Sequence, residues 1–148
     1  MLIAVDHRFV PLTRLLLHSG ADPALSGGPE NVFPLLKAAR AGEPDLVTLL
    51  LSYRADVNQK RPGDGMDPLA IACLEGHLPI VERLVARNAA VEPQDLSYAI
   101  GAGHVEVVKR LLAAGGDSAW TFGGRPMTQI ARESPARVRA DLLALLKR

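Results

Sequence analysis

Two histidines are the first side chains to consider as chemical groups, because they stand at matching places in neighbouring segments. His77 and His104 each directly follow a glycine. Two ligands of one zinc ion each lie about 2 Å from the metal, whereas packed helices stand roughly 8–10 Å apart. The pattern therefore predicts histidines that support a turn, and no shared metal site. His7 and His18 have no Cys or carboxylate at ligand spacing.

The other reactive residue types are equally isolated. Cys73 lies beside Ala72 among small residues, which predicts a buried and inert thiol. Glycine pairs beginning at Gly27, Gly115 and Gly123 lack the Gly-Lys-Ser/Thr ending of a phosphate-binding loop, so they indicate turns. No set of Ser, His and acid can be assigned from the sequence. We therefore predict no enzyme, no metal and no cofactor.

Composition narrows the class further. The chain has 148 residues, a hydrophobic content of 48% and a formal charge of +1, so no basic field indicates nucleic acid. No apolar run approaches the ~20 residues that span a bilayer, and the start MLIAVDHRFVPL is unlike a signal peptide. A single cysteine fits a reducing compartment. These features predict a cytoplasmic protein without nucleic-acid or membrane partners, and the excess of Arg over Lys hints at a bacterial genome.

Short helices must position any functional side chain, and residues 67–92 show them most clearly. Asp67, followed by proline, provides an N-cap and a favourable first helical position. The apolar run 69–74 predicts a helix, and Gly76 can take the positive φ that ends it. A second proline opens an amphipathic helix that ends at Asn88, a residue that tolerates the left-handed conformation.

The rest of the chain repeats this unit, with aliphatic or small residues kept at equivalent positions. Three aliphatic columns read Leu12, Leu46, Ile80, Val107, Val138; then Leu16, Leu50, Leu84, Leu111, Leu142; then Leu17, Leu51, Val85, Leu112, Leu143. A column of mostly small residues reads Ala4, Ala38, Ala72, Ala99, Ile130. A period of roughly 33 residues, made of two short helices and a turn, predicts an array of stacked repeats.

Short motifs recur at fixed places in these copies. They are Pro34-Leu35, Pro68-Leu69 and Pro126-Met127 before the first helix, Gly76-His77 and Gly103-His104 after it, and Gly20-Ala21-Asp22, Arg54-Ala55-Asp56-Val57-Asn58 and Gly115-Gly116-Asp117 at the end. On these residues the chain resembles the ankyrin repeat proteins, whose motif is T-P-L-H-x-A. The resemblance covers nearly the whole chain. It implies an all-α ankyrin repeat solenoid of about five helix-turn-helix repeats with hairpin or loop fingers and atypical terminal repeats.

The chain departs from the family in the same motif. The Thr and His of the tetrapeptide are absent from every copy: Phe33, Asp67, Gln94 and Arg125 hold the Thr position, and Leu36, Ala70, Ser97 and Thr128 hold the His position. The side-chain hydrogen bonds that those residues make in the family are therefore missing or replaced. We expect a less regular array with the same fold.

The spacing predicts one domain over residues 1–148, with repeats near 1–24, 25–58, 59–90, 91–118 and 119–148. Fingers are expected at 24–33, 58–67 and 118–125, and the first of them is alternatively a plain loop. Only three residues, 91–93, stand where the fourth copy should have a finger, which predicts a notch in the row. Leu2 and Ile3 leave an apolar edge at the first repeat, or the chain once continued upstream; the last helix has the polar surface of a cap.

The resemblance places partner contacts on the concave face, at inner-helix ends, on the fingers and at outer-helix ends. Trp, Tyr and Arg are enriched among binding hot spots, so Trp120 ranks first, although packing against the notch or the last repeat is an equal alternative for it. The candidate contact residues are Trp120, Phe122, Tyr53, Arg40, Arg132, Glu75, Met66, Asp64 and Arg87. Charged residues among them are more often solvated than bound.

The predicted function is a non-catalytic module that binds a protein partner through the concave face and finger loops, and that is a monomer when unbound. A narrower alternative is a bacterial immunity or self-protection protein that inhibits a cognate toxin or hydrolase by direct binding. An enzyme with a site in the notch would need a polar constellation near Leu96, Ser97 and Tyr98, and the sequence offers none. A secreted effector is a fourth alternative that the sequence neither favours nor excludes.

Overall fold

A computed structural model describes residues 1–28 and 30–147; Pro29, in the first expected finger, and Arg148, at the end of the last expected helix, lie outside it. The described chain contains five helix pairs and one two-stranded hairpin. The elements are α1 (Leu2–Asp6), α2 (Val10–His18), α3 (Pro34–Arg40), α4 (Pro44–Ser52), α5 (Pro68–Glu75), α6 (Leu78–Val85), α7 (Pro93–Ala102), α8 (Val105–Ala113), β1 (Thr121–Phe122), β2 (Arg125–Pro126), α9 (Met127–Glu133) and α10 (Ala136–Leu145).

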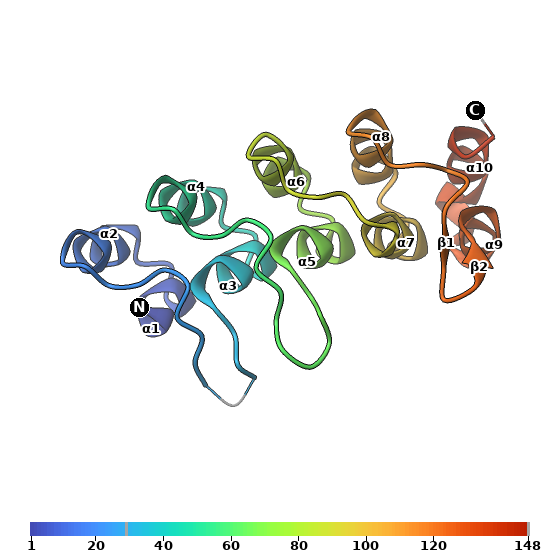
Figure 1. Cartoon of the computed structure of the whole chain (residues 1–148). Helices are drawn as coiled ribbons and strands as arrows, with labels where there is room; N and C mark the ends of the chain where they lie inside the picture. Colours follow the sequence, from blue (N-terminus) through green and yellow to red (C-terminus); the bar gives the residue numbers. More distant parts are fainter. Residues whose placement is uncertain (29, 148) are drawn as a thin grey trace.

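The helices stand in two rows (Figure 1). The inner row holds α1, α3, α5, α7 and α9, and the outer row holds α2, α4, α6, α8 and α10. Within each row a helix packs on the next in sequence order, as α3 does on α5 and α5 on α7. The two termini therefore lie at opposite ends of the stack. This arrangement confirms the predicted all-α solenoid of stacked helix pairs.

Local signals read from the sequence explain where the helices begin and end. The Asp67 carboxylate caps α5 by accepting a 2.8 Å hydrogen bond from the Ala70 amide. Gly76 follows α5 with φ +76°, and Asn88 takes φ +62° after α6. Both residues are in the left-handed region that ends a helix. The cap and both stops were correctly predicted.

The core is aliphatic and runs the length of the stack. Leu50, Leu84 and Leu111, which occupy one sequence column in successive layers, are completely buried and belong to one continuous cluster. A buried leucine truncated to alanine typically costs about 2–5 kcal/mol. The layers are therefore held together mainly by these side chains, as a chain with few aromatics requires.

Each of the two predicted turn histidines fits onto a glycine of the preceding layer. The His77 ring packs so close to Gly42 that a Cβ there would lie only 2.8 Å from it. Its Nε2 hydrogen-bonds the Arg40 carbonyl at 3.2 Å. The His104 ring lies over Gly76 in the same way, and its Nε2 meets the Leu74 carbonyl at 3.1 Å. The histidines thus link consecutive layers, which refines the prediction that they support turns.

The fingers extend from the inner row of helices, and one finger is missing from the series (Figure 1). In the first, Gly27 and Val32 exchange backbone hydrogen bonds of 3.0 and 3.2 Å, so it is a narrow hairpin and not a plain loop. The third is the β1–β2 hairpin, which leans on α7. Only residues 86–92 join α6 to α7, so the fourth pair has no finger, as its spacing predicted.

Candidate protein-binding surface

The concave face of the stack is formed by the inner helices and the fingers below them (Figure 1). Its two halves differ in chemistry. The half that belongs to α1, α3 and the first two fingers is dominated by charged side chains. The half that belongs to α5, α7, α9 and the third finger is more apolar and contains a hollow.

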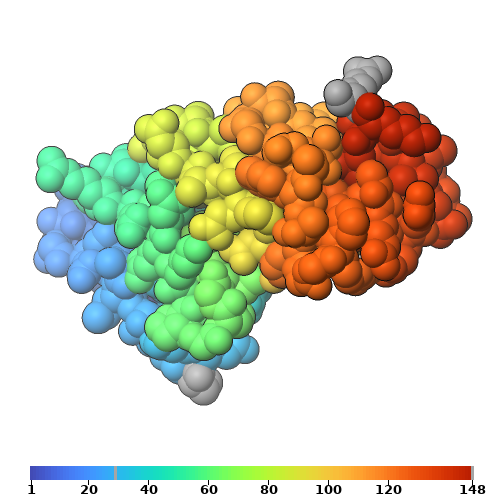
Figure 2. Space-filling view, turned by 45° about the vertical axis from the view of Figure 1, so that its right-hand side comes forward, coloured from blue at the N-terminus to red at the C-terminus, as the bar shows by residue number. Residues whose placement is uncertain are grey.

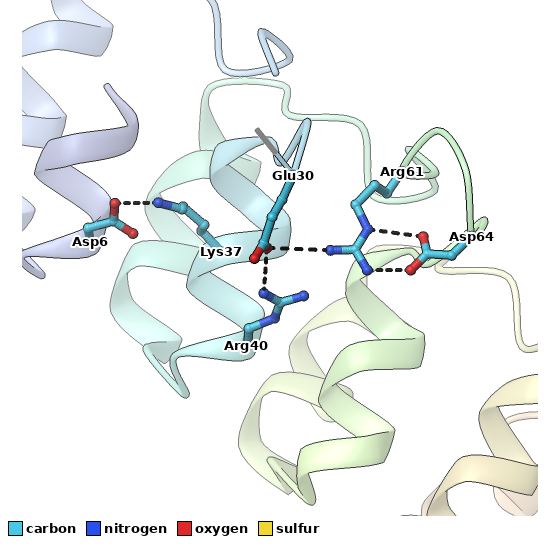
Figure 3. Close-up of polar contacts among 6 residues, drawn as sticks. All are labelled: Asp6, Glu30, Lys37, Arg40, Arg61 and Asp64. Carbon is cyan, nitrogen blue, oxygen red and sulfur yellow. Dashed lines mark hydrogen bonds and ion pairs between the residues drawn. The ribbon is translucent and has the colours of Figure 1, made fainter. Parts of the chain in front are cut away.

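Charges on the first half are paired into a network that joins three elements (Figure 3). Glu30 of the first finger accepts a hydrogen bond from Arg40 of α3 at 3.2 Å and lies 3.9 Å from Arg61 of the second finger. Arg61 also forms a two-pronged pair with Asp64, and this guanidinium lowers the pKa of Asp64 to about 2. A separate pair joins Lys37 to the end of α1 through Asp6. The first two fingers are therefore held against each other.

The second half holds a hollow of about 290 Å³ between α5, α7 and α9. Leu74 leaves more than a third of its surface exposed at the rim. Phe122 of β1 contacts the ring of Tyr98 edge-on, with centroids 5.8 Å apart, and Arg125 pairs with Glu133 across the far side. The lining residues are Leu74, Ser97, Tyr98, Gly101, Ala102, Arg125, Ile130 and Glu133.

A buried acidic side chain lies near the start of α7, where the finger is missing. Asp95 of α7 is fully buried; one carboxylate oxygen accepts a 2.7 Å bond from the Glu92 amide, and the other has no partner. Burial raises the pKa of Asp95 to about 7, with the nearby Asp67 and Glu92 carboxylates adding to the shift. Lys60 of the second finger pairs with Glu92 at 2.7 Å and closes the group toward solvent.

The residue types that carry metal or thiol chemistry are His, Cys, Asp and Glu. Within residues 1–28 and 30–147, no cluster of three His, Cys, Asp or Glu side chains is arranged to hold a metal ion. Cys73 is buried, and desolvation raises the pKa of its thiol well above the ordinary value, which keeps it protonated. None of the described helices is long and apolar enough to cross a membrane.

Comparison with known proteins agrees with the architecture. The family model for ankyrin repeats in three copies matches residues 1–95 and again residues 35–122, which together span most of the chain. The chain belongs to the ankyrin repeat family. Ankyrin repeats are generally non-catalytic modules that bind other proteins, so protein–protein interaction is the function class of this chain.

Three curated relatives match parts of the chain. Ankyrin repeat protein nuc-2 of Neurospora crassa is 33% identical over 119 residues, covering 76% of this chain and 11% of that protein. Ankyrin repeat and KH domain-containing protein mask-1 of Caenorhabditis elegans is 30% identical over 119 residues, covering 76% and 4%. ARF GTPase-activating protein Git of Drosophila melanogaster is 41% identical over 69 residues, covering 47% and 9%. The chain thus spans about a tenth or less of these relatives.

Four of the predicted contact residues lie in the ankyrin fingers. Phe122 contacts Tyr98 at the hollow and is 36% exposed, whereas Trp120 is less exposed and packs against the core. Asp64 is part of the paired network, and Met66 is half-buried beneath the second finger. The packing alternative for Trp120 therefore agrees with its position, and Phe122 is the more accessible aromatic side chain.

The other predicted residues divide between the concave face and the outer row. Arg40 belongs to the paired network, and Glu75 and Arg132 are exposed at the ends of α5 and α9. Tyr53 instead hydrogen-bonds His18 between the first two outer helices, and Arg87 donates to the Leu51 carbonyl at 3.4 Å. Tyr53 and Arg87 thus link ankyrin layers and stand apart from the concave face.

Sequence reasoning missed two features of this face. The role of Tyr98 beside Phe122 depends on how far the third finger bends onto α7, which no spacing specifies. Asp95 lies three residues after Glu92, the spacing of a helix-capping pair, and that signal was available in the sequence. Leu96 and Ser97, named as neighbours of a hypothetical notch site, are buried.

Proposed function

We propose that this ankyrin chain binds a protein partner through the second half of its concave face, with the hollow between α5, α7 and α9 as the centre of contact. The proposal rests on one observation. Of the large hydrophobic side chains exposed in the described chain, Leu74 lines the hollow and Phe122 contacts Tyr98, which also lines it. Exposed apolar groups beside a hollow are typical of a recognition site.

The surroundings support the same assignment. Glu75 and Arg132 stand exposed at helix ends on either side of the hollow and can orient a partner at the rim. The charged side chains described on the first half of the face already form ion pairs with one another, so they are less available to a partner protein. Helices and a hairpin hold the site in shape, so binding would cost little ordering entropy. We also propose that residues 1–148 act as one domain of five repeats.

Paired affinity captures test the proposal. The chain and its Leu74→Arg variant would be immobilised in parallel, with an exposed outer-row change, Glu82→Gln, as control. A specific partner is a protein retained by the chain and the control and lost from the Leu74→Arg column, after circular dichroism has shown equal helix content. Equal retention on all three columns would remove the hollow from the binding surface.

The narrower prediction, that the partner is a toxin or hydrolase inhibited by an immunity protein, is a special case of this proposal. It requires the captured partner to be an enzyme whose turnover falls on stoichiometric addition of the chain. Normal turnover at saturating chain would leave the binding proposal intact and exclude inhibition. Bacterial origin and cytoplasmic location stay predictions.

A further inference from the structure

Exposed hydrophobic side chains gather at the first helix pair, far from the hollow. Ile3 is 74% exposed and Leu15 is 62% exposed, and Phe9, Leu12 and Leu25 are each more than two-fifths exposed. Together with Leu74 and Phe122, these are all the large hydrophobics that the described chain exposes. We call the surface formed by Ile3, Phe9, Leu12, Leu15 and Leu25 the leading face.

The repeat itself shows which way the leading face points. One repeat further along the chain, the positions of Ile3, Phe9 and Leu25 are held by residues that reach back to the layer before them. Those contacts are Lys37 with Asp6, Glu43 with Arg8 at 3.0 Å, and Gln59 with the Ala24 carbonyl at 2.9 Å. The leading face is therefore the surface that in every later layer rests on a preceding helix pair.

Burial in later layers supports the same direction. Leu46 and Leu49 are the equivalents of Leu12 and Leu15 in the next layer; Leu46 is fully buried and Leu49 is 5% exposed. Arg83, one layer further, reaches back to Thr48 at 2.8 Å. Leu46 and Leu49 are thus covered in the second layer, whereas Leu12 and Leu15 are exposed in the first layer of the described chain.

The C-terminal end of a second copy is a poor match for the leading face. Arg132 on α9, Arg137 on α10 and Lys147 just beyond α10 are exposed, and this end exposes none of the large hydrophobics in the described chain. Head-to-tail stacking of two copies would press these charges onto apolar side chains without partners, which is costly. The two ends are far apart along the molecule (Figure 2), so no part of the described chain covers the leading face.

We propose that the leading face pairs with the leading face of a second copy of this chain across a two-fold axis. The five side chains at these exposures offer roughly 600 Å² of apolar surface per copy, at the upper end of what monomers leave open and near the ~800 Å² that each partner contributes to a stable dimer. None of the five carries a charge, so like positions meet without repulsion.

A recess in this face provides the fit that a dimer needs. A mostly apolar hollow of about 470 Å³ lies beside Ile3 and Leu25, and Asp22 is the one charged residue among the described residues that line it. A protruding side chain of the second copy, such as Phe9 or Leu15, is of a size that this hollow can receive. The contact would leave α5, α7 and α9 outside the interface, so dimer formation and partner binding are separable.

Mass measurement on the whole chain tests the pairing. Sedimentation equilibrium at micromolar concentrations is expected to give twice the 15.8 kDa chain mass. The Ile3→Lys, Leu15→Arg double variant should weaken dimer formation by roughly 100-fold or more, because each copy would bury charges without partners. The stack accepts these residues in the same columns, as Lys37 and Arg83 show.

The matched control is Leu74→Arg, an equally drastic change at an exposed leucine on the concave face, which should leave the dimer unchanged. A wild-type monomer, as the sequence alone predicted, would overturn the proposal. So would a double variant that dimerises as tightly as the wild type. If the double variant loses its helical circular dichroism, the single variant Leu15→Arg replaces it, and the same measurement of dimer formation tests the proposal.

Discussion

Two junctions between layers show how one stacking rule accommodates different chemistry. At the junction of the second and third layers, His77 seats on Gly42, and a full finger accompanies the next inner helix. At the junction of the third and fourth layers, His104 seats on Gly76, but the finger is missing and a buried carboxylate, Asp95, stands behind the gap. The stack continues through both junctions.

The difference separates what stacking requires from what it tolerates. Both junctions keep a left-handed glycine, a histidine ring against it and a leucine in the buried column. The finger is dispensable, because the inner helices α5 and α7 pack on each other without it. The cost of the missing finger is a desolvation penalty. One carboxylate oxygen of Asp95 is buried without a hydrogen-bond partner.

The largest expected effect follows from the shared part of the junctions. A Cβ on Gly76 would lie 2.5 Å from the His104 ring, and φ +76° is already unfavourable for alanine. Gly76→Ala should therefore lower the free energy of unfolding by roughly 2–4 kcal/mol, measured by urea titration. Gly63→Ala, at φ +104° with open space around it, should cost only about 1 kcal/mol. Equal losses at the two sites would show that backbone strain, and not a clash with the His104 ring, determines the loss of stability.

The second effect belongs to the missing finger and depends on pH. The pKa of Asp95 is raised to about 7, so the folded state binds a proton more tightly than the unfolded state does. The stabilisation is complete below the unfolded pKa of about 4 and is lost as pH rises through about 7. Burial also raises the pKa of Asp67, which acts in the same direction. Stability should therefore decline between about pH 4 and pH 7.

Asp95→Asn isolates that contribution. The amide keeps an oxygen for the Glu92 backbone N–H and removes the buried charge. The variant should be more stable than wild type by roughly 4 kcal/mol at pH 8 and nearly equal to it at pH 4, by urea titration at both values. Asp45→Asn, at an exposed site of the outer row, is the control and should change neither. A gain at pH 8 that persists undiminished at pH 4 would contradict the titration of Asp95.

The third effect compares the two halves of the concave face. With a captured partner in hand, Phe122→Ala should weaken binding by more than ~1 kcal/mol, as truncation of an accessible aromatic anchor does. Arg40→Ala, in the already paired half, should cost less than ~0.5 kcal/mol, as expected of a rim charge. Calorimetry on both variants decides. The reverse ranking would move the binding centre to the first two fingers.

The sequence predicted the stack because its information is periodic. The aliphatic columns, the glycine stops and the shortened fourth repeat each depend on spacing along the chain, and all three agree with the structure. Features that depend on side chains meeting across layers were not predictable in the same way. The pairing of Glu30 with Arg61 and the contact of Phe122 with Tyr98 require the fingers to be placed first.

The leading face illustrates the same limit. Leu2 and Ile3 were identified as an apolar edge from their place at the start of the first repeat. That Phe9, Leu15 and Leu25 join this edge could be established only from contacts in the next layer, such as Gln59 with the Ala24 carbonyl. Sequence columns indicate which residues are equivalent; the structure shows which direction each column faces.

The smallest effect concerns Lys60, which bridges the gap left by the missing finger through its pair with Glu92. Both side chains are substantially exposed, so Lys60→Gln should cost only about 0.5 kcal/mol at low salt, and the loss should fade in 1 M salt. The ammonium also lowers the pKa of Asp95. Its removal should therefore shift the pH-dependent decline of stability to higher pH. If the decline keeps its midpoint, Lys60 and Asp95 are electrostatically independent, and the junction depends on Asp95 burial alone.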